Sequence, residues 1–168
     1  MEKDNFFGDA TYEIPETSNY MKFKDGENKF RVLSSAITGW EYWNNQNKPI
    51  RNKDTWATVP DDIREDSDIK HFWAFFVYNY EAKKVQILQI TQKGIMKYIK
   101  SLTANPKWGN PKGYDITVTK SGSGMSTEYT YIADPHSELD SKIKDQFSKM
   151  KVDLSLLYAG GDPFTPEK

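Results

Sequence analysis

The stretch "HFWAFFVYNYEAKKVQILQIT", residues 71–91, decides the fold of this chain. Residues 71–80 hold seven rings, counting the imidazole of His71, and this enrichment in aromatic residues is typical of a β-strand. Residues 84–91 form a second run with a strand-like composition, and only the short "EAK" segment separates the two. We therefore predict an antiparallel hairpin of two strands.

Further strands and one helix are predicted on either side of this hairpin. Residues 29–43, "KFRVLSSAITGWEYW", follow the turn signal "KDGEN" and predict a long strand that bends at Gly39. Residues 92–106 place Ile95, Ile99 and Leu102 at helical spacing and end near Pro106. Two more strands are predicted in "GYDITVTK" and "STEYTYIA", joined by a turn at "SGSG". In the first of them, Tyr114, Ile116 and Val118 are expected to point inward.

The order strand, strand, strand, helix, strand, strand is that of the OB barrel. We therefore predict a mainly β fold: a five-stranded OB barrel with a helix between strands three and four. Other small α+β folds share this order, so the order alone does not decide the fold. The connection between strands one and two, residues 44–70, is unusually long and predicts a functional insertion. In OB barrels this loop flanks the ligand-binding face.

The aromatic strand raises the question of which of its faces is buried. Phe72, Ala74, Phe76, Tyr78 and Tyr80 lie on one face, because alternate side chains of a strand point to opposite sides. One face would line the barrel, and the other would stack unpaired nucleobases. We expect the face with Tyr78 and Tyr80 to be the open one, because tyrosine tolerates water on one side. The alternative is that both faces are buried.

The long insertion interleaves aromatic and basic side chains, which is a pattern typical of single-strand binding. At least one of its tryptophans is expected to cap the barrel end instead. The candidate DNA-binding residues are Trp40, Tyr42, Trp43, Lys48, Arg51, Lys53, Trp56, Trp73, Tyr78, Tyr80 and Lys84, together with Lys107, Lys120, Tyr129 and Tyr131 on the far side of the site. Lys107, Lys120 and the two last tyrosines are the weaker candidates, since each is also an ordinary surface or core residue type.

The charge distribution agrees with a site for a polyanion. The 168-residue chain has a net charge of −1, but residues 20–120 have a net charge of +6, between ends of −4 and −3. Without the acidic run "PDDIREDSD" this central part reaches +10. A basic centre between acidic ends favours nucleic acid as the partner. Ordinary unevenness of a solvated surface is the alternative.

Several function classes are disfavoured. Cysteine is absent, which excludes disulfides and thiolate metal sites. The sequence has no apolar run long enough to cross a membrane and no signal peptide, so we expect a soluble, intracellular protein. The usual phosphate-loop, metalloprotease and serine-hydrolase motifs are missing, so we expect no enzyme, no catalytic residue and no cofactor. A nuclease built from distant carboxylates is the remaining enzymatic alternative.

Ordered blocks of the sequence resemble a known family. The blocks are "YMKFKDGENKFRVLSSAITGWEYW", "IR" at residues 50–51, "HFWAFFVYNYEAKKVQILQITQKGIMKYI" and "WGNPKGYDITVTKSGSGMSTEYTYIADP". Together they resemble the single-stranded DNA-binding proteins of tailed bacteriophages over residues 18–135. The resemblance implies an OB fold that coats single-stranded DNA, without base preference, during phage replication, recombination and repair in the cytoplasm of the bacterial host. It assigns the binding cleft to Trp40, Tyr42, Trp43, Arg51, Trp73, Tyr78 and Lys120.

The chain departs from this family in its metal ligands. Some phage relatives hold a structural zinc ion with Cys and His, whereas this chain has no Cys and only His71 and His136. We therefore expect no zinc. A module of OB type for single-stranded RNA or for a protein partner is the alternative function.

The ends of the chain are expected to lie outside the binding domain. We divide the chain into an N-terminal arm at 1–17, the DNA-binding domain at 18–135, and a C-terminal helix and flexible tail at 136–168. In "SELDSKIKDQFSKM" the residues Leu139, Ile143 and Phe147 share one helical face, with Ser137 as the N-cap. We expect this helix to pack on the barrel, and the C-terminal region is also the candidate for binding phage replication or recombination proteins.

Overall fold

The computed structural model describes residues 6, 8 and 18–166, and its fold is mainly β. The strands of the described part are β1 (Gly26–Val32), β2 (Ile37–Trp43), β3 (Pro49–Asn52), β4 (Lys70–Asn79), β5 (Lys84–Ile90), β6 (Asp115–Ser121) and β7 (Glu128–Ala133). The α-helices are α1 (Lys93–Ala104) and α2 (Ser141–Ser148), and the short 3-10 helices are η1 (Pro111–Gly113), η2 (Gly124–Ser126) and η3 (Leu154–Ala159). All seven strands pair antiparallel in one sheet.

Strand β4 organises the sheet because it pairs on both of its edges. One edge pairs with β5, which confirms the hairpin predicted at residues 71–91. The other edge pairs with β2 along its first half and with β1 along its second half. Strand β6 then pairs with β1, and β7 pairs with β6. Within the described residues β5 and β7 do not pair, so the sheet is open and does not close into a five-stranded barrel.

The prediction of one long strand over residues 29–43 is wrong in one respect. The chain forms β1 and β2, separated at Leu33–Ala36, instead of one strand bent at Gly39. At the break, the backbone N–H of Phe76 donates to Ser34 Oγ, so a side chain replaces a regular ladder bond. Gly39 lies inside β2, where a Cβ would clash with the carbonyl of Asn52 on β3. Its role is to allow close approach of the two strands.

Helix α1 forms where the spacing of apolar residues predicted it. Gln92 caps its N-terminus by accepting the backbone N–H of Ile95. The buried face consists of Ile95, Met96, Ile99 and Leu102, and Asn105 ends the helix just before Pro106. This face packs on the main core cluster, which also contains the predicted inward residues Tyr114, Ile116 and Val118. Burial of this amphipathic face is the main stabilisation of a helix of this length.

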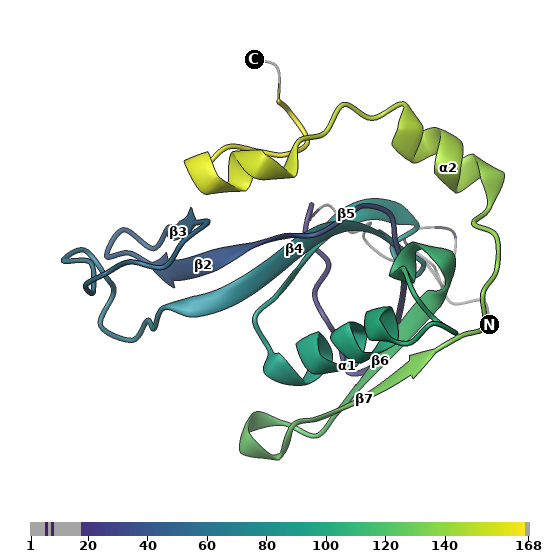
Figure 1. Cartoon of the computed structure of the whole chain (residues 1–168), viewed down its shortest axis with the longest axis horizontal. Helices are drawn as coiled ribbons and strands as arrows, with labels where there is room; N and C mark the ends of the chain where they lie inside the picture. The colour runs from purple at the N-terminus through teal and green to yellow at the C-terminus, as the bar shows by residue number, and fades with distance from the viewer. Residues whose placement is uncertain (1–5, 7, 9–17, 167–168) are drawn as a thin grey trace.

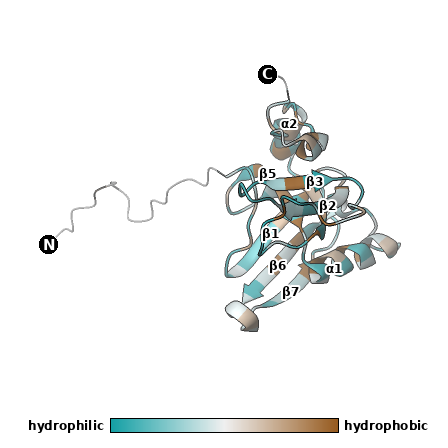
Figure 2. Ribbon diagram, turned by 90° about the vertical axis from the view of Figure 1, so that its left-hand side faces the viewer, coloured by the Kyte–Doolittle hydropathy of each residue, from teal (hydrophilic) through white to brown (hydrophobic). Residues whose placement is uncertain are grey.

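The opposite side of the sheet is covered by a segment that we call the strap, residues 141–166, which includes α2 and η3. Figure 1 shows the strap in yellow-green above the sheet and α1 below it, and Figure 2 shows the same layers from the side. Its side chains Phe147, Leu154, Leu157 and Phe164 pack against the sheet, and the Phe76 ring lies 5.6 Å from Phe147 and 5.3 Å from Phe164. The packing of the C-terminal helix on the sheet is therefore confirmed, although α2 begins after the N-cap Asp140 and not after Ser137.

The strap also answers the question of the two faces of β4. Phe72, Ala74 and Phe76 are buried beneath the strap, while Phe75 and Val77 are buried on the α1 side. Both faces of the central part of β4 are therefore buried, and the expectation that the Phe72 face is open is wrong. The reason is that apolar residues more than 70 positions later in the chain cover this face, which the local pattern of β4 does not encode.

A buried arginine fixes the chain that leads to the strap. Arg31 on β1 is 1% exposed, and its Nε donates to Asp115 Oδ1 at 2.7 Å. Its terminal nitrogens donate to the backbone carbonyl and to the hydroxyl of Ser137. Charge-assisted bonds of this kind hold a buried guanidinium in one position. Arg31 thereby connects β1, β6 and the segment before α2.

Candidate nucleic-acid interface

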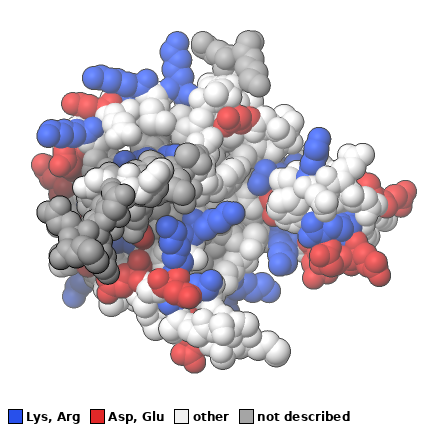
Figure 3. All heavy atoms as spheres, turned by 180° about the vertical axis from the view of Figure 1, so that it is seen from behind, with Lys and Arg blue, Asp and Glu red and all other residues white. Residues whose placement is uncertain are grey.

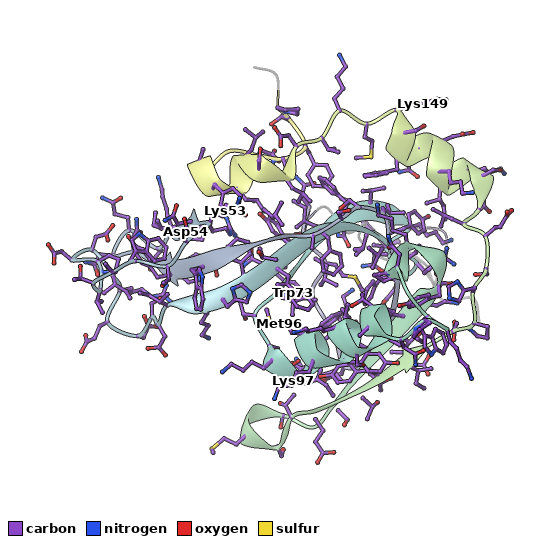
Figure 4. The ribbon with its side chains drawn as sticks, viewed as in Figure 1. Lys53, Asp54, Trp73, Met96, Lys97 and Lys149 are labelled. Atoms are coloured by element: carbon purple, nitrogen blue, oxygen red, sulfur yellow. The ribbon has the colours of Figure 1, made fainter. Side chains whose placement is uncertain are left out.

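A hollow of about 610 Å³, which we call the Trp73 cleft, lies on the α1 side of the sheet. Ser34, Ser35 and Ala36, in the break between β1 and β2, form one wall. Trp73 and Phe75 of β4 form a second wall, and Ile99, Lys100 and Thr103 of α1 form a third. Trp73 projects from β4 toward α1, where Met96 and Lys97 lie (Figure 4). The residues that line the cleft within the described part include no acidic side chain.

A row of three rings extends from this cleft along the sheet. Trp40 on β2 lies opposite His71 on β4, and Trp73 is two residues further along β4, so the three side chains share one face. The ring centroids of Trp40 and His71 are 4.9 Å apart. All three residues are half-buried. Half-buried rings on one face of a sheet can stack on unpaired bases.

His71 carries an unusual polar atom within this row. Its Nδ1 is buried and has no hydrogen-bond partner among the described residues. An unsatisfied buried polar group costs about 1–3 kcal/mol. The position of His71 is therefore not explained by the hydrogen bonding of the folded chain itself.

Helix α1 presents a row of lysines beside the cleft. Lys93, Lys97 and Lys100 follow the spacing i, i+4 and i+7, so they share one face, and all three are exposed. The sequence contains seven lysines and no Asp or Glu between Ala82 and Tyr114. Within the part of the chain that the structure describes, none of the three helix lysines forms an ion pair. This side of the cleft is therefore positively charged.

A second hollow, the Trp43 groove, lies on the other face of the sheet and has a volume of about 830 Å³. It is bounded by Tyr20 and Lys22 near the start of the described chain, by Trp43, Lys48 and Arg51 around β3, and by Leu157 of the strap. Three of these residues, Trp43, Lys48 and Arg51, were predicted for the site, whereas Tyr20 and Lys22 were not. Burial raises the pKa of the Tyr20 hydroxyl, and the nearby positive charge of Arg51 opposes this.

A buried network holds Arg51 at the floor of this groove. Its Nε lies 2.9 Å from Glu41 Oε2 and donates to Gln89 Oε1 at 3.0 Å. Gln89 Nε2 in turn donates to Glu41 Oε2 at 2.7 Å. The charge of Arg51 is thus offset by Glu41, and its guanidinium lies 6.0 Å from the centre of the Phe72 ring.

The predicted residues Tyr42 and Trp56 pack within the insertion. Tyr42 is 5% exposed, its hydroxyl donates to Asp62 at 2.7 Å, and its ring meets Trp56 edge-on at 4.8 Å. Burial raises the pKa of Tyr42 to about 12, and the hydrogen bond to Asp62 adds to this. Trp56 therefore packs on Tyr42 within its own loop, which is not the capping of a barrel end expected for at least one tryptophan. Lys53 is exposed and directly follows β3 (Figure 4).

The predicted Tyr78 on β4 and Tyr80 just after it lie away from both hollows. Tyr78 is half-buried against the strap cluster and meets Tyr80 edge-on at 5.3 Å. The Tyr80 hydroxyl donates to Asp115 at 2.7 Å, and burial together with this bond raises the pKa of Tyr80. Lys84 is half-buried at the start of β5, opposite Asn79. These side chains do not join the aromatic row of Trp40, His71 and Trp73.

The candidates on the far side of the site are distributed over β6, β7 and the loop after α1. Tyr131 stacks on Tyr98 of α1 at 5.2 Å, and its hydroxyl donates to Gln92 at 3.1 Å. Tyr129 packs against the main core cluster, and Lys120 lies opposite it on β6. Lys107 is exposed in the loop that follows α1. Tyr131 is thus close to the N-terminus of α1, whereas the other three residues lie elsewhere.

Sequence reasoning missed His71, Lys93, Lys97 and Lys100. The signal for the lysines was present, because an amphipathic helix without acidic residues places i, i+4 and i+7 cations on one side. What the sequence could not show is that this helix face borders Trp73. That proximity follows from the pairing of β4 with β2 and β1, which creates the cleft.

No protein-family model, curated protein or solved structure matches this chain. Among the described residues, no helix has the length and apolar character needed to span a bilayer. The same part of the chain contains no cluster of three or more His, Cys, Asp or Glu side chains placed to hold a metal ion. Basic and acidic side chains are interspersed on the face of the molecule drawn in Figure 3.

Proposed function

We propose that this protein binds single-stranded DNA without sequence preference and that the Trp73 cleft is its main binding site. The observation that carries the proposal is the row of Trp40, His71 and Trp73, which ends at the cleft that Trp73 and Lys100 of α1 both line. Rings stack on bases of any identity, and each stacked base contributes about 1–3 kcal/mol. Lysines hold phosphates without reading the base. The arrangement favours an extended, unpaired strand over a duplex, whose bases are already stacked.

The order of strand pairing supports the same proposal. Taken along the sheet, β5, β4, β1, β6 and β7 are neighbours, with α1 between β5 and β6 in the chain. This order of neighbouring strands, with the helix between the third and fourth of them along the chain, is that of a partly open OB barrel, a fold that binds oligonucleotides. The strap covers the outer face of β4 and β5, so we assign the strand to the α1 side, between the sheet and the lysines.

The resemblance to phage single-stranded DNA-binding proteins adds a biological setting to the proposal. It favours protection of transient single strands during phage replication, recombination and repair in the host cytoplasm. The C-terminal region remains our candidate for contacts with replication or recombination proteins. We expect no catalysis and no zinc.

The test is a titration of the tryptophan emission with oligo(dT) at several salt concentrations. We expect quenching of the emission and an affinity that falls steeply with salt. In a plot of log affinity against log salt concentration, each phosphate contact should add about 0.7 to the steepness of the slope. Replacing Lys97 and Lys100 together by Gln should lower this slope by about 1.4. Replacing Lys142 and Lys149 of the strap by Gln is the matched control and should leave it unchanged. Unchanged emission of the natural protein in dilute buffer would refute the proposal.

A competition experiment separates the remaining binding functions. Oligo(U) of the same length should compete more weakly than oligo(dT) if DNA is the ligand. An equal or stronger effect of oligo(U) would favour single-stranded RNA. Weak salt dependence would instead favour a protein partner, because an apolar interface releases few counterions.

A further inference from the structure

The Trp43 groove is a second basic and aromatic surface on the face of the sheet opposite the Trp73 cleft. Its rings are Tyr20 and Trp43, its cations are Lys22, Lys48 and Arg51, and the described residues that line it include no acid. Apolar side chains of Met21 and Leu157 complete it. Its volume of about 830 Å³ exceeds that of the cleft.

Trp43 is the ring in this groove that is best placed to stack on a base. It keeps 38% of its surface exposed, which makes it one of the few large hydrophobic side chains of the described residues that do so. The guanidinium of Arg64 lies 5.6 Å from the indole centre, but Arg64 pairs with Asp66 and does not line the groove. The cations beside the indole in the groove are Lys22, Lys48 and Arg51, and an exposed ring beside cations is the combination that single-strand sites use.

The phosphate contacts in the groove are assigned to Lys22 and Lys48. Both are exposed, and neither forms an ion pair within the described residues. Arg51 is different, because Glu41 at 2.9 Å offsets its charge and its side chain is only 9% exposed. Arg51 is therefore a positioning residue that holds β2, β3 and β5 together, and not a main phosphate ligand.

The edge of the sheet beside the groove is formed by β3, whose residues Pro49, Ile50 and Arg51 line the groove. Strand β3 is the last strand of the sheet on this side and pairs only with β2 among the described residues. Lys48 precedes β3 and the exposed Lys53 follows it. Stacked sheets lie about 10 Å apart, so one sheet with its side chains has a thickness of this order. At about 3.4 Å per nucleotide of a stacked strand, roughly three nucleotides cross that distance.

From these observations we propose that the Trp43 groove is a second contact for the same DNA strand, reached around the edge of β3. The inference rests on the proposed function and extends it. The protein then has two regimes of binding. An oligonucleotide of about 4 nucleotides fills the cleft alone, and one of about 16 nucleotides reaches the groove as well, within the range of single-strand sites on OB-type domains.

The experiment compares three double variants on oligo(dT) of about 4 and about 16 nucleotides. They are Lys22→Gln with Lys48→Gln in the groove, Lys97→Gln with Lys100→Gln at the cleft, and Lys142→Gln with Lys149→Gln as the control. The groove variant should bind the short oligomer normally, while its salt slope on the long one falls by about 1.4. The cleft variant should be weakened on both lengths, and the control on neither. Thermal melting of each variant checks that the fold is intact.

The outcomes separate this inference from the proposed function. If the groove variant binds the long oligomer as the natural protein does, the second contact is overturned while the cleft stands. Equal weakening on both lengths would also overturn it, because the groove would then belong to a single short site. If the natural protein binds neither oligomer, the proposed function itself fails.

Discussion

Replacement of Leu154 by Ala tests whether the strap is part of the folded core. Leu154 is 8% exposed at the start of η3 and packs in the cluster with Phe72, Phe76 and Ile87. Buried Leu→Ala substitutions cost about 2–5 kcal/mol in free energy of unfolding. For a chain of this size each kcal/mol shifts the melting temperature by about 2–4 °C. The expected decrease is therefore about 4–20 °C.

The assay is thermal unfolding followed by circular dichroism, with urea denaturation as a second measure of the free energy. Leu156→Ala is the matched control, because the same side chain is only half-buried two residues further along. Its cost should be clearly smaller. A change of less than about 0.5 kcal/mol for Leu154→Ala, the range typical of surface positions, would refute the structural role of the strap.

The same variant decides between the two faces of β4 as the DNA surface. If DNA had to displace the strap, a strap weakened by about 2–5 kcal/mol would make binding tighter by a corresponding factor, since about 1.4 kcal/mol is tenfold. The proposed cleft lies on the other side of the sheet, so we expect the affinity for oligo(dT) to change less than twofold. A weakening of about 2 kcal/mol corresponds to roughly thirtyfold in affinity. An affinity for oligo(dT) increased by about thirtyfold or more would therefore place the DNA strand beneath the strap.

Three further predictions concern stability. Arg31→Met leaves Asp115 without its buried partner and should lower the free energy of unfolding, measured by urea denaturation, by about 3–5 kcal/mol. Lys29→Met removes a half-exposed partner of the same carboxylate and should lower it by less than about 1 kcal/mol. The pKa of Tyr42 is raised to about 12, so its protonated hydroxyl stabilises the fold below about pH 10, and this contribution is lost as the pH rises to about 12. In Tyr42→Phe the free energy of unfolding, measured by urea denaturation, should therefore fall less between these two pH values than in the natural protein. Gly39→Ala should destabilise the chain, because its Cβ would clash with the backbone of β3, and a melting temperature equal to that of the natural protein would contradict this.

The sequence predicted those parts of the fold that depend on local pattern. The 71–91 hairpin, α1 and the two C-terminal strands were found because strand and helix periodicities differ and because short turns join neighbouring strands. The break at Leu33–Ala36 was missed, since "VLSSA" is compatible with an extended chain. The break forms because β1 and β2 pair with different halves of the same edge of β4, which one continuous strand cannot do. This requirement depends on the pairing of the whole sheet and not on the local sequence.

The candidate site shows the same division between local and distant information. Trp40 and Trp73 were recognised as unusual from their own surroundings, and they share one face of the sheet. Tyr78 was assigned to an open face because nothing near it in the sequence indicates the strap that covers it. Lys97 and Lys100 were overlooked because a lysine on a helix is ordinary until its neighbour is known. Residue type is thus readable from sequence, whereas proximity depends on tertiary pairing.

Photocross-linking tests the central claim most directly, namely that a single strand lies between the aromatic row and α1. An oligo(dT) of about 16 nucleotides with iodouracil in place of thymine is irradiated with the natural protein, and the attached peptides are identified by mass spectrometry. We predict cross-links to the peptides that contain Trp40, His71 or Trp73. Cross-links that are confined to the strap, or found only on the β6–β7 hairpin, would contradict the account.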